Sequence, residues 1–258
     1  MSLLYQTTGI VLSRRDYREA DRWYSVFTPD KGKVEFLARG GSKPLAKLTP
    51  HLEMIAEVEL LLVFGRHYQT VAGVDRKRSF AGIYDDISKL TLAHNAMHLL
   101  DIGTRPQESD PNLYHLLSTW LAFLEKSPSL SKERAAFLTA SFTLKLLALI
   151  GYHPELTSCL ACRKPVSSGA FKWHALKGGV VCKTCALSNE QQWFAARAMT
   201  DSTLKLVRHA LYESFENQLR PHLKGEDIAG FHEAVESLII SHFPTIPASS
   251  LRASCGVC

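Results

Sequence analysis

Alternating apolar and polar residues divide the first third of the chain into five short runs that are typical of β-strands. The runs span residues 9–15, 22–28, 33–40, 54–65 and 67–75. Between the second and third runs, the sequence PDKG at 29–32 predicts a tight hairpin turn, because proline fixes φ and glycine tolerates positive φ. So many short strands without helical segments between them favour a small five-stranded barrel of the OB type, with a β-sandwich as the alternative.

Helical periodicity replaces this pattern after residue 80. Apolar residues recur at helical spacing in 85–102, 112–126, 131–150, 201–219 and 226–243, and a capping-box pattern at 188–191 begins a further helix. Asp110 followed by Pro111 predicts the start of the second of these helices, as an N-cap and a first helical residue. The sequence therefore predicts an α+β chain with two domains. An OB-type domain at residues 1–80 precedes an all-α domain at 81–258, which is interrupted at 155–187.

The interruption contains two C-x-x-C motifs separated by nineteen residues, a spacing typical of a zinc ribbon. A disulfide framework is disfavoured because nothing marks the chain as secreted, and a redox site would use only one pair. We predict one structural Zn2+ ion, held by four thiolates that leave no position for a catalytic water. The predicted ligands are Cys159, Cys162, Cys182 and Cys185. A third C-x-x-C motif, at 255–258, is assigned no role.

The composition indicates a globular protein with a buried core and a local excess of positive charge. Hydrophobic residues make up 46% of the 258 residues, and no apolar run is long enough to cross a bilayer, so we expect a soluble, cytoplasmic protein without membrane contact. The formal net charge is +5, and residues 1–80 hold thirteen Lys/Arg against nine Asp/Glu. Clustered positive charge indicates a polyanionic partner; an ordinary solvated surface is the alternative.

The excess of lysine and arginine is concentrated around the first predicted hairpins. Lys33 and Arg39 are six residues apart on one predicted strand, so they are expected to project from the same face, about 20 Å apart. Tyr17 is the expected base-stacking residue, whereas Trp23 and Phe27 are expected in the barrel core. The predicted cationic contacts in this domain are Arg14, Arg15, Arg18, Lys31, Lys33, Arg39 and Lys43.

Neither a phosphate-binding loop nor a nucleophile-elbow motif accompanies this basic region. The leading hypothesis is therefore a binding protein without a chemical step. A metal-dependent nucleic-acid-processing enzyme is the first alternative, with Asp16, Glu19 and Asp21 as possible Mg2+ ligands, although alternating arginines make ion pairs the simpler interpretation. A protein-interaction scaffold is the second alternative.

The stretch GIVLSRRDYREADRWYSVFTPDKGKVEFLARGGSK, together with LIGYHPEL, the four cysteines and LVRHALYESFENQL, resembles the bacterial RecO family of recombination mediators. The resemblance implies an OB-fold protein of the nucleoid that binds single- and double-stranded DNA, anneals complementary strands and takes part in DNA repair. It also implies contacts with RecR and with the C-terminal tail of single-stranded DNA-binding protein, and an indirect role in loading RecA.

By the same resemblance, Lys33, Arg39 and Arg208 would be DNA contacts. The pocket for the tail of single-stranded DNA-binding protein would lie in the helical region. Its candidate residues are Leu138, Phe142 and Leu146, with Arg134 or Lys145 as the basic partner.

Overall fold

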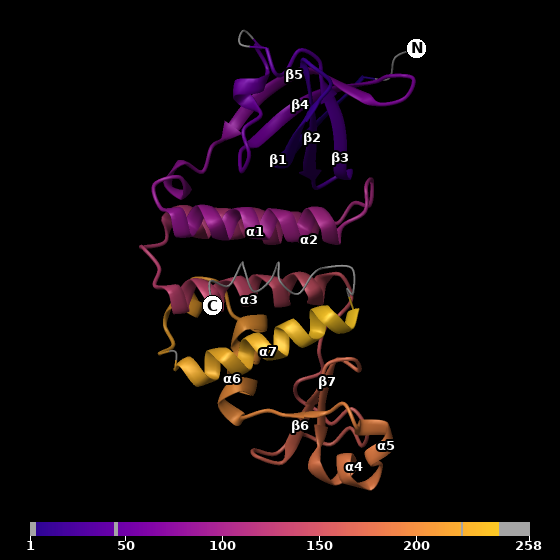
Figure 1. Cartoon of the computed structure of the whole chain (residues 1–258), viewed down its shortest axis with the longest axis vertical. Helices are drawn as coiled ribbons and strands as arrows, with labels where there is room; N and C mark the ends of the chain where they lie inside the picture. The colour runs from indigo at the N-terminus through magenta and orange to yellow at the C-terminus, as the bar shows by residue number, and fades with distance from the viewer. Residues whose placement is uncertain (1–3, 44–45, 223, 243–258) are drawn as a thin grey trace. The chain divides into compact units, whose positions relative to one another are not determined.

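A computed structural model describes residues 4–43, 46–222 and 224–242. The chain folds into two compact units, Met1–Ser129 and Leu130–Cys258, and each is considered separately (Figure 1). Strands give way to helices near the expected domain boundary at residue 80, but the first two helices lie in the same unit as the strands. Within the part of the chain that the structure describes, no helix has the length and hydropathy needed to span a bilayer.

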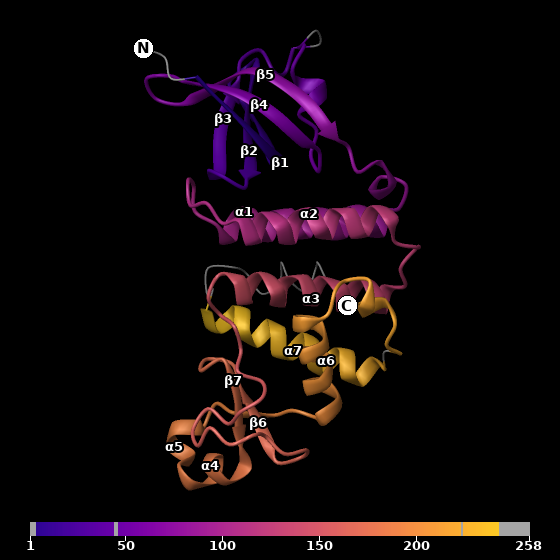
Figure 2. The ribbon, with the colours of Figure 1, turned by 180° about the vertical axis from the view of Figure 1, so that it is seen from behind.

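The first unit is built on a closed five-stranded barrel (Figures 1 and 2). Its strands are β1 (Leu4–Tyr17), β2 (Asp21–Thr28), β3 (Gly32–Ala38), β4 (Glu57–Phe64) and β5 (Gln69–Arg78). They follow the order β1-β2-β3-β5-β4, and β4 pairs with β1 to complete the ring. Only the short β3–β5 contact is parallel among these pairs. The predicted OB-type barrel is confirmed, and the β-sandwich alternative is wrong.

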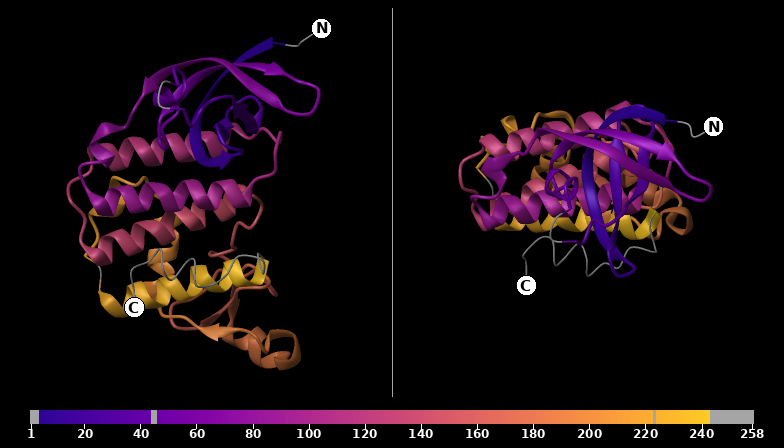
Figure 3. Two further views of the ribbon diagram at one scale, coloured as in Figure 1. Left: turned by 45° about the horizontal axis from the view of Figure 1, so that its top comes forward. Right: turned by 90° about the horizontal axis from the view of Figure 1, so that it is seen from above.

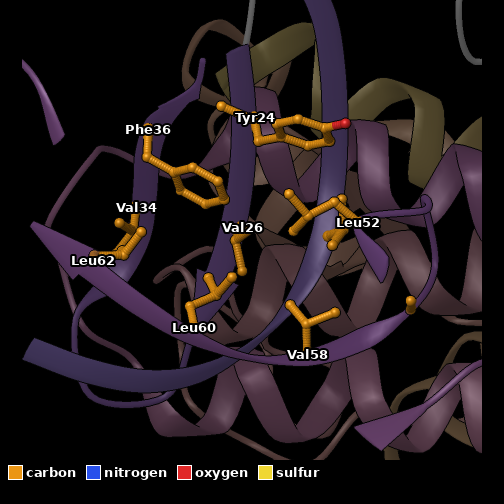
Figure 4. Close-up of a cluster of buried hydrophobic side chains, with 11 residues drawn as sticks. Tyr24, Val26, Val34, Phe36, Leu52, Val58, Leu60 and Leu62 are labelled. Carbon is orange, nitrogen blue, oxygen red and sulfur yellow. The ribbon is translucent and has the colours of Figure 1, made fainter. Parts of the chain in front are cut away.

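Alternation along the strands fills the barrel with apolar side chains (Figure 4). On β4, Val58, Leu60 and Leu62 are fully buried, while the residues between them are partly exposed. Tyr24 and Phe36 stack in the same interior with ring centroids 5.8 Å apart. Burying aromatic and branched side chains at every second position stabilises the barrel and fixes its strand register.

The turn between β2 and β3 forms as the sequence predicts. Gly32 adopts φ +65°, a conformation that is costly for other residues. The Lys31 amide donates to the Thr28 hydroxyl at 3.0 Å, and that hydroxyl donates to the Gly32 carbonyl at 3.0 Å. These bonds close the hairpin.

Two helices, α1 (Ile87–Gly103) and α2 (Pro111–Lys126), complete the first unit and pack against β1 and β2 (Figure 1). The Asp110 carboxylate caps α2 by accepting from the amides of Asn112 and Leu113, which confirms the predicted helix start. Two short 3-10 helices, η1 (Thr49–His51) and η2 (Ala81–Ile83), lie in the connections.

Three helices form the body of the second unit: α3 (Lys132–Leu149), α6 (Asp201–Tyr212) and α7 (Gly225–His242), which pack against one another (Figure 3). Phe137 of α3 and Phe231 of α7 meet with ring centroids 5.2 Å apart. The sequence predicts a continuous helix to residue 219, but α6 ends at Tyr212 and a 3-10 helix, η3 (Asn217–Leu219), follows.

The predicted interruption is a small folded insertion between α3 and α6, which we call the cysteine module (residues 156–200; Figure 1). It contains strands β6 (Phe171–His174), β7 (Gly179–Cys182) and β8 (Arg197–Ala198), and helices α4 (Lys183–Ser188) and α5 (Glu190–Trp193). The strands form a sheet in the order β7-β6-β8. The module thus extends beyond the predicted end at residue 187.

Candidate nucleic-acid interface and metal centre

Three aromatic rings and two arginines meet on the outside of the barrel, and we call them the stacking cluster. The Tyr17 and Trp23 ring centroids are 5.9 Å apart, and those of Trp23 and Tyr68 are 6.1 Å apart. The Arg15 guanidinium lies 5.6 Å from the Trp23 centroid, and that of Arg18 lies 5.3 Å from the Tyr17 centroid. These distances are typical of cation–π pairs.

Strand register explains how the cluster assembles. Arg15 pairs with Trp23 across the β1–β2 hairpin, so their side chains share a face, and Tyr17 lies two residues further along the same face. Tyr68 comes from the β4–β5 connection. The β1–β2 and β4–β5 loops are a usual ligand-binding region of OB folds.

Trp23 was expected in the core, and this prediction is wrong: its ring is half-buried on the outer face of β2. Phe27 is fully buried, but it lies on the same face of β2 as Trp23 and is not among the side chains that fill the barrel. Tyr17 retains 37% of its surface accessible to solvent, which leaves ring surface available for a ligand. The cluster therefore combines rings that can stack on bases with arginines that can contact phosphates.

Two further predicted cations lie at the same end of the barrel as the stacking cluster. Arg39 follows β3, whose last residue, Ala38, pairs with Arg22 close to the β1–β2 hairpin. The following loop is tied to this hairpin by hydrogen bonds from Gly40 N to the Asp21 carboxylate (2.8 Å) and from Ser42 N to the Ala20 carbonyl (2.9 Å). Both Arg39 and Lys43 are exposed.

Strand geometry separates Arg14 and Lys31 from this group. Arg14 is exposed, but it pairs with Tyr24 and so lies on the opposite strand face from Arg15. Lys31 is exposed in the β2–β3 turn, which follows the other end of β2.

Lys33 is buried against α1. Its ammonium donates to the Asp101 carbonyl at 2.5 Å and lies 3.3 Å from the Asp101 carboxylate, with 11% of the side chain exposed. The same carboxylate accepts from the hydroxyls of Ser13 (3.1 Å) and Ser25 (3.0 Å). Lys33 and Arg39 therefore do not form the shared cationic face that strand alternation predicts, and Lys33 is held by internal partners.

The candidate basic residues of the second unit also bond to backbone carbonyls. Arg208 donates to the Leu156 carbonyl through Nε (3.2 Å) and Nη2. Arg134 donates to the carbonyls of Gln218 and Pro221, both at 2.7 Å. Lys145 donates to a further carbonyl, at 2.8 Å, and burial lowers its pKa. The arginine contacts join α3 and α6 to segments outside these helices, and the Lys145 contact joins α3 to α6.

The apolar candidates for the tail-binding pocket, Leu138, Phe142 and Leu146, are at most 3% exposed. They contribute to the core of the second unit. A peptide would reach them only after this core opened.

The acidic residues beside the stacking cluster are also engaged. Asp16 pairs with Arg22 at 3.1 Å, and Asp21 accepts from the Gly40 amide. Among the described residues, the four-cysteine cluster is the one group of three or more potential ligands close enough to hold a metal ion. Asp16, Glu19 and Asp21 do not form such a group.

The two C-x-x-C motifs converge on one point of the cysteine module. Their ligand atoms, the Sγ atoms of Cys159, Cys162, Cys182 and Cys185, all lie within 4.8 Å of one another. Tetrahedral zinc–thiolate bonds of about 2.3 Å require sulfur atoms about 3.8 Å apart, so the cluster has the size for a single ion. The predicted ligand set is confirmed as a cluster that can bind a metal.

Backbone amides donate hydrogen bonds to two of these sulfurs, those of Cys159 and Cys182. The amides of Ala161 and Cys182 donate to the Cys159 Sγ at 3.4 and 3.3 Å, and the Cys185 amide donates to the Cys182 Sγ at 3.5 Å. Burial opposes ionisation of Cys159, but these donors and the Cys162 amide outweigh it and lower the pKa of Cys159 to about 6. A stabilised thiolate is the form that binds metal.

Glu155 fixes the backbone just before the first motif. Its carboxylate accepts from the Thr157 hydroxyl (2.7 Å) and from the amides of Thr157 (2.8 Å) and Ser158 (2.9 Å), and these bonds lower its pKa to about 2. It is therefore a capping residue, and it donates no proton near neutral pH.

Two family models together match nearly the whole chain. The model described as Recombination protein O N terminal matches residues 1–80, and that described as Recombination protein O C terminal matches residues 84–239.

Three relatives, each named DNA repair protein RecO, show the same likeness. The relative from Heliobacterium modesticaldum is 31% identical over 81% of this chain and 74% of its own length. The relative from Desulfitobacterium hafniense is 28% identical over 84% of this chain and 78% of its own length. The relative from Symbiobacterium thermophilum is 27% identical over 92% of both chains. The chain belongs to the Recombination protein O family.

Proposed function

We propose that this chain is a DNA-binding mediator of recombinational repair that holds single-stranded DNA on the stacking cluster. Membership of the RecO family supports a role in DNA repair. The observation that carries the specific proposal is the grouping of three rings with Arg15 and Arg18, and with Arg39 and Lys43 at the same end of the barrel. Unpaired bases stack on aromatic rings, while the cations neutralise the phosphates between them.

Annealing follows from this mode of binding. Two complementary strands repel each other through their phosphates, and bases must be unpaired before they meet. A protein that neutralises phosphates and holds bases apart needs no chemical step, so we propose a mediator without catalytic activity. Double-stranded DNA binds through the same cations, without the stacking contribution.

The partners that we propose are RecR, the C-terminal tail of single-stranded DNA-binding protein and, indirectly, RecA. The positions of Leu138, Phe142 and Leu146 in the core argue against them as the docking residues in this conformation. For the four-cysteine cluster we propose one structural Zn2+ ion, bound by thiolates with no open coordination position.

The substitution Arg15→Glu with Arg18→Glu tests the interface. We expect roughly 10- to 100-fold weaker binding to oligo(dT) at low salt, and a salt dependence that is shallower by about 0.7 log units for each phosphate that the protein no longer neutralises. Fluorescence anisotropy at several salt concentrations measures both quantities. The control, Arg105→Glu with Lys126→Glu, makes the same change of charge at exposed positions of the same unit and should leave both unchanged. Equal affinity for the two variants would contradict the proposal.

Removing the rings tests the stacking contribution separately. Tyr17→Ala with Tyr68→Ala should weaken single-stranded binding by about 1–3 kcal/mol for each base that the rings no longer stack, with a smaller effect on duplex binding. Mixing labelled complementary strands with protein and Mg2+, without ATP, then separates mediator from enzyme. Duplex formation supports the mediator, and cleaved strands would support a nuclease.

A further inference from the structure

The cysteine module carries more positive charge per residue than the barrel does. Residues 156–200 hold six Lys/Arg and one Asp/Glu, a formal net charge of +5, whereas residues 1–80 reach +4. Four thiolates with a divalent ion add a charge of −2, so the metal-bound module remains at +3. The six cations are Arg163, Lys164, Lys172, Lys177, Lys183 and Arg197.

These cations are open to solvent. All are exposed except Lys172, which is partly buried. No ion pair involves any of the six within the described part of the chain. By contrast, several cations of the first unit, such as Arg22, Lys33 and Arg78, are paired with carboxylates. Two carboxylates at the ends of the module offset part of this charge, because Glu155 interacts with Arg163 and Asp201 with Lys183. The other four cations have no such partner in the described part of the chain.

The fold gathers part of this charge around the cysteine cluster. Arg163 and Lys164 directly follow Cys162, and Lys183 lies inside the second motif. Because the four sulfurs converge within 4.8 Å, the two motifs are brought together with the cations that they carry.

An exposed aromatic ring lies beside one of these cations. Phe194 is 79% exposed, although phenylalanine side chains are usually buried. The Arg197 guanidinium donates to the Phe194 carbonyl at 3.2 Å, which holds the cation close to the ring's own backbone. A phosphate-binding group and a stacking surface thus occur together, as they do in the stacking cluster of the barrel.

We propose that the cysteine module is a second nucleic-acid-binding surface, on which Lys164, Lys183 and Arg197 contact phosphates and Phe194 stacks on a base. The proposal rests on the proposed function, since it adds a second strand to the one held by the barrel. One chain then carries two strands at once, which raises the local concentration of each strand near the other.

An acidic peptide is the competing ligand, and the structure favours it less. The groove of about 440 Å³ between β8 and α7 is lined by Arg197, but also by Glu226 and Glu233. These carboxylates disfavour any anion inside the groove, so a ligand of Arg197 would have to reach it from outside the groove. The remaining cations are spread over both cysteine motifs and the β6–β7 hairpin, which suits an extended phosphate backbone better than a single pocket.

A strand-bridging experiment with the full chain tests the proposal. Oligo(dT) on beads captures the protein, and a fluorescent oligo(dT) is added; the two strands cannot pair, so retention of fluorescence reports simultaneous binding. We expect Lys164→Glu with Lys183→Glu to reduce retained fluorescence about fivefold or more, with a change below about twofold in capture by the beads. Lys132→Glu with Lys224→Glu, exposed cations of the same unit, should change neither.

Metal content and melting temperature establish that the module variant is folded. The neutral pair Lys164→Ala with Lys183→Ala and the single change Phe194→Ala provide further variants, each with an expected partial loss of bridging. Bridging at the wild-type level by the folded charge-reversed variant would overturn the proposal. Such a result would mean that the second strand is not held by the cysteine module, for example because two protein copies bridge the strands through their barrels alone. Tighter binding of a fluorescent polyglutamate peptide than of oligo(dT), lost in the same variant, would also overturn it.

The two proposals fail in different ways. If Arg15→Glu with Arg18→Glu abolishes capture by the beads while the module variant behaves as wild type, the second surface is wrong and the barrel interface holds. If neither pair of substitutions changes any DNA binding, the proposed function itself is wrong.

Discussion

Replacing Cys182 with serine is expected to release the metal ion and unfold the cysteine module. Apparent binding free energies of structural zinc sites are about 10–16 kcal/mol, which far exceeds the stability that so small a core can supply. The buried residues of that core are Cys159, Val181, Ala186, Trp193 and Ala196. Metal analysis should show loss of one ion per chain, and Trp193 should become exposed, which tryptophan fluorescence detects.

Cys255→Ser is the matched control, because it removes a thiol outside the cluster and outside the described residues. It should leave the ion content of the cluster and the melting temperature unchanged. A Cys182→Ser protein with wild-type stability would show that the cluster does not depend on metal. Oligo(dT) binding through the barrel should persist in the Cys182→Ser protein, because the stacking cluster belongs to the other compact unit.

Replacing Lys33 with alanine is expected to destabilise the first unit by about 2–3 kcal/mol. The change leaves the Asp101 carboxylate without its cation. Breaking a fully buried ion pair in this way costs about 3–5 kcal/mol. The cost is expected to be lower here because the Asp101 side chain is 24% exposed. Urea unfolding of the variant measures the loss. Oligo(dT) affinity of the folded variant should remain close to that of the wild type, because Lys33 faces α1 and not solvent.

Lys31→Ala serves as the comparison, since Lys31 is exposed in the adjacent turn and should change stability by less than about 0.5 kcal/mol. The opposite outcome is equally informative. If Lys33→Ala weakened DNA binding and left stability unaltered, Lys33 would be a DNA contact, as the family resemblance implies.

Local signals in the sequence were sufficient for much of the fold. Asp110 followed by Pro111 placed the start of α2, because a cap and a fixed φ act within one turn of helix. Gly32 placed the β2–β3 turn for a similar reason. The cysteine cluster was also predictable, because the spacing of a C-x-x-C pair itself directs two thiolates to one ion.

Contacts between distant segments were not predictable in this way. The role of Lys33 depends on Asp101, a helix residue far along the chain, and alternation along a strand does not reveal what covers each face. Tyr68 was missed because it joins Trp23 only when the β4–β5 connection reaches the β1–β2 hairpin. The sequence alone predicts Trp23 in the barrel core, but its pairing with the exposed Arg15 places it outside.

The order of the strands has a consequence for synthesis of the protein. β1 pairs with β4 and β3 pairs with β5, so the ring closes only after the first residues of β5, Gln69 and Thr70, are available. Tyr68 joins the stacking cluster at the same stage. A ribosome-bound chain that has emerged only as far as β3 would therefore carry its arginines without a complete ring system. The proposed selectivity for unpaired bases would arise only late in translation of the first unit.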